Sequence, residues 1–134
     1  MITTQVQRHG TVLVSVTGSL DESAGSALRQ ALDRVGTDER DLMVDLHGAR
    51  SMDVDGLLHL LALHRQAENL GLRVLVVGWQ PQPRQLMADV AGIRGRHSVT
   101  GERYAVAGFR RLIEERAQRV RDLSDFQAGW MSGA

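Results

Sequence analysis

The stretch VDLHGARSMDVDGL, residues 44–57, joins a strand to a buried helix and decides the fold of the chain. The apolar residues over 42–46 are typical of a strand, and the polar and glycine residues over 47–51 predict a loop after it. Over residues 54–70, leucines recur on more than one face of a helix. We therefore expect this helix to be among the most buried in the protein.

Two carboxylates, Asp53 and Asp55, stand at the start of that predicted helix. Free backbone N–H groups and the positive end of the helix dipole favour anionic side chains there, by roughly 0.3–1 kcal/mol each. Judged on residue chemistry alone, an aspartate at this place is most often only a helix cap. Asp21 or Ser23 is expected to cap the preceding helix in the same way.

Strands and helices alternate on either side of this stretch. Val12, Val14 and Val16 recur at every second residue, which predicts a strand with one buried face. The His9-Gly10 turn favours an antiparallel hairpin with a weaker strand over 2–7. The other predicted elements are helices over 24–35, 83–90 and 106–120, a strand over 74–77 and a short last strand over 97–99.

This order of elements predicts an α/β fold. We expect a mixed, mostly parallel sheet of about four or five strands with an N-terminal β-hairpin, packed with about four helices.

The composition narrows the classes of function. The chain has 134 residues, which suits one domain, and its 16 basic and 16 acidic residues give no positive field that would attract nucleic acid. Without cysteine, disulfides, thiolate chemistry and Cys-based zinc sites are excluded. The start lacks the pattern of a secretory signal, and the most apolar stretch is too short to insert into a membrane. We therefore expect a cytoplasmic protein without a cofactor, and zero net charge leaves a homodimer open.

Three segments resemble the STAS domain family. Gly18-Ser19-Leu20-Asp21 is similar to the Gly-Glu-Leu-Asp turn of the family, and residues 44–57 resemble its strand, loop and helix start, which ends in Asp-Ser-Ser-Gly-Leu. Residues 71–78, followed by Pro83-Arg84-Gln85-Leu86-Met87, resemble its next strand and helix. The order and spacing of the segments carry the resemblance. It implies a STAS domain over residues 1–118 and a C-terminal extension over 119–134 that is partly helical or disordered.

The resemblance is to bacterial anti-sigma factor antagonists, in which the second serine of Asp-Ser-Ser-Gly accepts phosphate from the cognate anti-sigma kinase. By position, that phosphoacceptor falls on Asp55 and the preceding serine on Val54, whereas Asp53 and Gly56 match the family. The chain thus keeps the aspartate and the glycine of the motif and lacks the serine hydroxyl that accepts phosphate. Either Asp55 mimics the phosphorylated state, or the partner is adapted to aspartate and binds constitutively. We slightly favour the second hypothesis.

The function that the resemblance implies is a non-enzymatic docking protein in bacterial partner switching, whose partner is an anti-sigma kinase of the GHKL fold. The expected partner surface consists of Asp21, Met52, Asp53, Val54, Asp55, Gly56 and His59. The alternative is the STAS subunit of a phospholipid-transport ABC complex, which binds the transporter ATPase. A weaker alternative is a STAS module that senses a small ligand. Catalytic motifs and glycine-rich phosphate loops are absent from the sequence.

The tail raises a separate hypothesis. Leu123, Phe126 and Trp130 recur at helical spacing in otherwise polar sequence. Either they pack onto the domain, or they form a short docking segment for a partner or a second copy of the chain.

Overall fold

The chain folds into one four-stranded sheet with helices packed against it, in a computed structural model that describes residues 1–6, 10–36, 38–92 and 107–132. The strands are β1 (Ile2–Val6), β2 (Thr11–Leu20), β3 (Asp41–Met52) and β4 (Arg73–Val77), and the helices are α1 (Ala24–Asp33), α2 (Val54–Asn69), α3 (Pro81–Ala91) and α5 (Ala107–Ser132). In this described part of the chain, none of the helices is long and apolar enough to cross a membrane.

The sheet has the strand order β1-β2-β3-β4 and mixed directions. β1 pairs with β2 in antiparallel fashion, and the pairs β2–β3 and β3–β4 are parallel. The prediction of a mostly parallel sheet with an N-terminal hairpin is therefore confirmed. The short strand expected over 97–99 lies outside the described residues.

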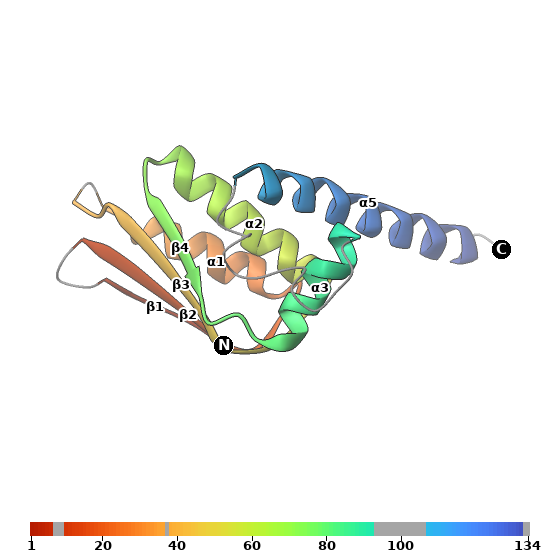
Figure 1. Ribbon diagram of the computed structural model, residues 1–134, viewed down its shortest axis with the longest axis horizontal. Helices are drawn as coiled ribbons and strands as arrows, with labels where there is room; N and C mark the ends of the chain where they lie inside the picture. Colours follow the sequence, from red (N-terminus) through yellow and green to blue (C-terminus); the bar gives the residue numbers. More distant parts are fainter. Residues whose placement is uncertain (7–9, 37, 93–106, 133–134) are drawn as a thin grey trace.

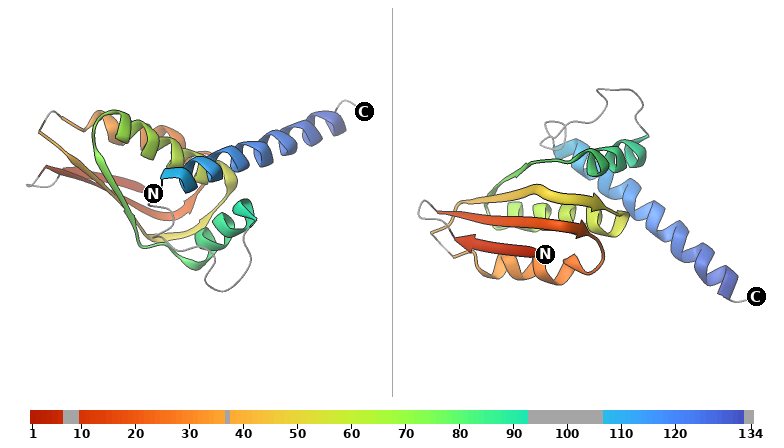
Figure 2. Two further views of the ribbon diagram at one scale, coloured as in Figure 1. Left: turned by 45° about the horizontal axis from the view of Figure 1, so that its top comes forward. Right: turned by 90° about the horizontal axis from the view of Figure 1, so that it is seen from below.

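α1 and α2 lie side by side on one face of the sheet, as Figures 1 and 2 show, while α5 runs along α2 and α3 lies beside the end of β3. Val12, Val14 and Val16 point into the resulting core, each at most 1% exposed. Leucines of α2 fill much of that core: Leu57, Leu58, Leu60, Leu61 and Leu63. The expectation that α2 is deeply buried is confirmed, because its apolar residues meet the sheet, α1 and α5 together.

One prediction is wrong: residues 47–51 form strand, not loop. β3 continues to Met52, and β2 beside it continues to Leu20. The two strands stay paired as far as Leu20 and Met52, after register shifts that begin beyond Ser15. Inter-strand hydrogen bonding thus overrides the weak strand propensity of this glycine-containing segment.

Helix boundaries also differ from the predictions. α3 begins at Pro81 and not at Pro83, because a proline in the first turn lacks only an N–H that would have no partner inside the helix. α5 continues past residue 118, where we placed the end of the STAS domain, to Ser132. The domain boundary itself stays a prediction.

Candidate functional site

The first turn of α2 is capped by Asp53. This residue has extended backbone angles (φ −103°, ψ −179°), and its Oδ1 accepts a hydrogen bond of 2.8 Å from the backbone N–H of Gly56. Its backbone carbonyl accepts the Leu57 N–H at 2.9 Å, which begins the helical hydrogen-bond pattern. Such a cap typically contributes about 1 kcal/mol to the stability of the protein. The predicted role of Asp53 as a cap is confirmed.

Gly56 lies directly beneath the end of β2. A Cβ atom on this residue would lie 1.9 Å from the carbonyl oxygen of Leu20 and 3.0 Å from the nitrogen of Asp21. The same Leu20 carbonyl accepts a hydrogen bond of 3.2 Å from the N–H of Asp53. Only glycine allows this close approach, so the start of α2 is fixed against the turn that follows β2.

Asp21 organises that turn. Its Oδ1 accepts hydrogen bonds from the Ser23 hydroxyl at 2.6 Å and from the Ser23 N–H at 3.0 Å. These bonds, the hydroxyl bond first, lower the pKa of the Asp21 carboxyl below its ordinary value. Ser23 occupies the N-cap position of α1, but its side chain makes no capping hydrogen bond. Asp21 therefore holds the entry into α1 through Ser23, and neither residue caps the helix in the way we expected.

Two glutamines, Gln80 at the N-cap of α3 and Gln82 in its first turn, support the last part of β3, where β4 no longer runs alongside. The side-chain amide of Gln82 accepts from the Met52 N–H at 2.7 Å and donates to the Met52 carbonyl at 2.9 Å, as a neighbouring strand would. Gln80 donates to the carbonyl of His47 at 2.6 Å. This arrangement fixes Met52, the residue immediately before the cap of α2.

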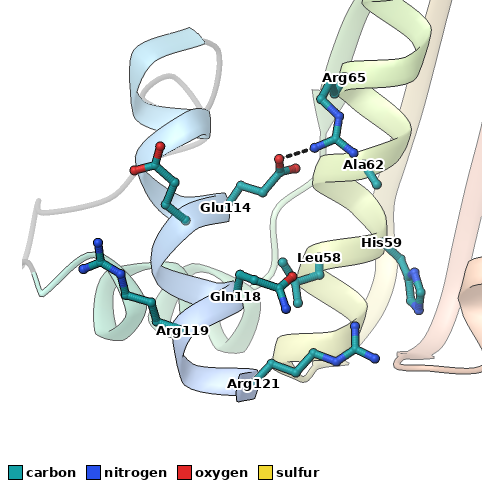
Figure 3. A pocket seen from close by; sticks show the side chains of 9 residues that line it. Leu58, His59, Ala62, Arg65, Glu114, Gln118, Arg119 and Arg121 are labelled. Carbon is teal, nitrogen blue, oxygen red and sulfur yellow. Dashed lines mark hydrogen bonds and ion pairs between the residues drawn. The ribbon is translucent and has the colours of Figure 1, made fainter. Parts of the chain in front are cut away.

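Asp55 faces the C-terminal helix. Its Oδ1 lies 3.2 Å from Nε of Arg121 on α5, with the Asp55 side chain 33% and the Arg121 side chain 43% exposed. Figure 3 shows Arg121 reaching from α5 toward the start of α2. Sequence patterns gave no sign of this pair, because its members are far apart in the chain and a mixed-charge helix looks like an ordinary solvated face.

His59 lies on the side of α2 that meets α1. It is half-buried, and a Cβ atom on Gly25 of α1 would come within 2.5 Å of the His59 ring. In Figure 3 the His59 ring points away from α5. The His59 side chain thus packs between α1 and α2, one helical turn after Asp55.

These side chains surround a shallow hollow between the start of α1, the start of α2 and α5. Of the residues we predicted, the structure places Asp21, Asp53, Asp55 and His59 around it. Val54 is half-buried, whereas Met52 and Gly56 are buried and support the surface from below. The other residues around the hollow, which sequence reasoning missed as site residues, are Glu22, Ser23, Gly25, Ser26, Arg29 and Arg121.

The hollow carries acidic groups in excess: Asp21, Glu22, Asp53 and Asp55 face the cations Arg29 and Arg121. Within the described ranges, no group of three or more His, Cys, Asp or Glu side chains is placed to hold a metal ion. The arrangement presents hydrogen-bonding and charged groups on a rigid helix start, which suits recognition of another polar surface.

A family model described as Mlab, STAS domain, matches residues 3–95. No curated protein sequence matches the chain closely enough to count as a relative.

Three solved structures share the fold. A serine-to-glutamate variant of RsbS from Moorella thermoacetica aligns over 60% of this chain and 68% of its own, at 22% identity and a TM-score of 0.53. The anti-sigma factor antagonist SpoIIAA, in its unphosphorylated form, aligns over 64% and 80%, at 19% identity and a TM-score of 0.52. A sulfate transporter family protein from Wolinella succinogenes aligns over 82% and 93%, at 17% identity and a TM-score of 0.56.

Identities this low establish likeness of fold alone. The family model, in contrast, covers more than half of the residues, including every segment that builds the start of α2. The chain therefore belongs to the STAS domain family.

Proposed function

We propose that this STAS domain is a non-enzymatic docking protein that binds an anti-sigma kinase of the GHKL fold in bacterial partner switching. The observation that carries the proposal is the helix start at 53–56. It is capped by Asp53, packed closely under the end of β2 and bordered by an acidic hollow. By its motif, it corresponds in position to the phosphoacceptor segment of the anti-sigma factor antagonists that the chain resembles. A surface that is fixed before binding loses little conformational entropy when a partner docks.

Residue 55 sets the mode of regulation that we propose. Asp55 has no hydroxyl, so it cannot take phosphate in the way a serine does. Its carboxylate brings about one negative charge, whereas a phosphate would bring nearly two. Arg121 at 3.2 Å offsets part of that single charge. These features make Asp55 a poor imitation of phosphoserine and support binding that is outside phosphorylation control.

A second candidate is the STAS subunit of a phospholipid-transport ABC complex, which would bind the transporter ATPase. The observation that favours it is the matching family model, whose description names Mlab and not an anti-sigma factor antagonist. The absence of a hydroxyl at residue 55 also suits a module without kinase control.

Binding of the purified chain to candidate partners tests the proposal. A GHKL anti-sigma kinase and an ABC ATPase from the same genome would each be titrated by calorimetry. The variant Glu22→Arg reverses an exposed charge at the hollow, and Asp33→Arg makes the same change at the exposed end of α1. We expect Glu22→Arg to change the affinity for the kinase about tenfold or more, and Asp33→Arg to leave it within about twofold.

Three outcomes contradict the proposal. Binding to the ATPase alone would favour the second candidate. If Glu22→Arg and Asp33→Arg changed the affinity for the kinase equally, the interface would not lie at the start of α2. Incubation with the kinase and ATP should leave the chain unphosphorylated by intact mass, and phosphate on Ser51 would show that the domain is switched after all.

A further inference from the structure

α5 lies antiparallel along α2, and ion pairs mark its path. Arg110 contacts Glu68 at 2.7 Å near the end of α2, and Arg65 pairs with Glu114. Farther along α5, Arg121 reaches Asp55 in the first turn of α2. α5 therefore runs from the far end of α2 to the candidate docking surface.

The first part of α5, as far as Ala117, packs into the core, whereas the second part, over residues 118–124, does not. Ile113 and Ala117 are fully buried in the core. From Gln118 to Ser124 every residue is exposed, including Val120 at 40% and Leu123 at 62%. Figures 1 and 2 show this second part projecting past the body of the domain. Phe126 and Trp130 of the predicted tail segment have side chains outside what the structure describes.

Arg121 is the contact between this projecting part and the docking surface. Asp55 Oδ1 has almost no solvent exposure and no hydrogen-bond partner among the described residues, so the guanidinium of Arg121, 3.2 Å away, supplies its counter-charge as an ion pair. Around them the hollow holds the further carboxylates Asp21, Glu22 and Asp53. Arg121 thus occupies the position that a basic group of an arriving partner would otherwise take.

We propose that Arg121 is a latch that reversibly holds the second part of α5 against Asp55, so that the chain regulates access to its own docking surface. The regulation of this surface rests on the proposed function, whereas the latch is a property of the chain alone. α5 lies wholly outside the residues that the family model matches, so this control is an addition to the shared domain.

The strength of the contact suits a reversible latch. Both side chains are partly exposed, and an ion pair of this kind shifts an equilibrium by about two- to fivefold. Salt screens such a pair, since the Debye length falls to a few ångströms near 1 M ionic strength. A partner that buries an interface of ordinary size can therefore displace Arg121 at small cost.

Hydrogen exchange on the full chain tests the latch without any partner. In Arg121→Ala we expect amides over 118–124 to exchange about two- to fivefold faster, while amides over 110–117 keep their wild-type rates. Arg111→Ala, an exposed arginine at the other end of α5, is the matched control and should change neither segment. Arg121→Lys keeps the charge and should restore much of the protection. Unchanged exchange over 118–124 in Arg121→Ala would overturn the proposal.

Access to Asp55 is tested on the wild-type chain by labelling carboxylates with a carbodiimide and glycine ethyl ester. Raising the salt from about 0.05 M to about 0.5 M should increase labelling of Asp55 relative to the exposed Asp33. A ratio that does not change with salt would mean that α5 does not control access, and would contradict the latch.

The partner experiment separates the two proposals. If the kinase binds, Arg121→Ala should tighten binding about two- to fivefold, because α5 no longer competes. Weaker binding would show that Arg121 contacts the partner, and would overturn the latch. If neither the kinase nor the ATPase binds the wild-type chain, the proposed function fails, while the exchange and labelling results still decide the latch.

Discussion

The sharpest prediction concerns Gly56, where an added methyl group has no space. In Gly56→Ala the new Cβ would lie 1.9 Å from the Leu20 carbonyl oxygen, and this contact must open to at least 3.4 Å to become ordinary. The obstacle is backbone, so either α2 or the end of β2 has to move. That movement strains the hydrogen bond from the Asp53 N–H to the same carbonyl.

The magnitude follows from opposing contributions. Overpacking of this kind costs about 1–3 kcal/mol or somewhat more, and the weakened hydrogen bond adds about 1 kcal/mol. Alanine regains up to about 1 kcal/mol, because it favours helix more than glycine does. We expect Gly56→Ala to lower the free energy of unfolding by about 1–3 kcal/mol.

Two further glycines in helices serve as controls for the same chemical change. A Cβ on Gly108 of α5 would meet no atom of the described residues within 4 Å, so Gly108→Ala should be neutral or raise stability by up to about 1 kcal/mol. The atoms nearest to a Cβ on Gly25 would be those of the His59 ring, which is a side chain and not backbone, so Gly25→Ala should fall between the other two. Urea unfolding followed by circular dichroism measures all three. If Gly56→Ala matched Gly108→Ala, the close approach of α2 to β2 would be refuted.

Three other predictions concern the support of the site and the pH dependence of folding. Gln82→Ala should lower the free energy of unfolding in urea by about 1–3 kcal/mol, because the N–H and the carbonyl of Met52 lose their hydrogen-bond partner. A loss below about 0.5 kcal/mol would contradict the strand-like role of the Gln82 amide. Asp53→Ala should cost about 1 kcal/mol while Asp53→Asn retains most of the stability, and equal losses would speak against the cap. Burial, and then Arg110, lowers the pKa of His64 from 6.5 to about 4, so the unfolded chain binds more protons between these values. The contribution of His64 to the free energy of unfolding is therefore fully present above about pH 6.5 and is lost as the pH falls toward about 4, by up to about 3 kcal/mol. The variant His64→Gln should flatten this part of a plot of stability against pH. An unchanged slope in that variant would contradict the assignment to His64.

The local chemistry of the proposed docking surface was largely predictable. The cap at Asp53 follows from an aspartate before a leucine-rich helix, whereas the sequence showed only that Gly56 matches the family motif, and the structure supplied the reason for the glycine. Periodicity also predicted which face of β2 is buried, because alternate residues of a strand face opposite sides, and the leucines on more than one face of α2 predicted a deeply buried helix.

Other parts of the site depend on residues that meet only after folding. Residues 47–51 read as a loop, and become strand because β2 runs beside them. Gln82 looks like any surface glutamine until α3 brings its amide to the edge of β3. Arg121 belongs to a run of mixed charges that carries no periodic signal.

The sequence by itself determined the family, the order of the elements, and the residues at the start of α2, since each depends on short segments whose meaning is local. Tertiary structure alone decided that Asp55 has a counter-charge within the chain and that Met52 and Gly56 lie beneath the surface. The physical reason is that charge pairing and close packing depend on distance in space, and the Arg121 side chain reaches Asp55 only because α5 packs back along α2.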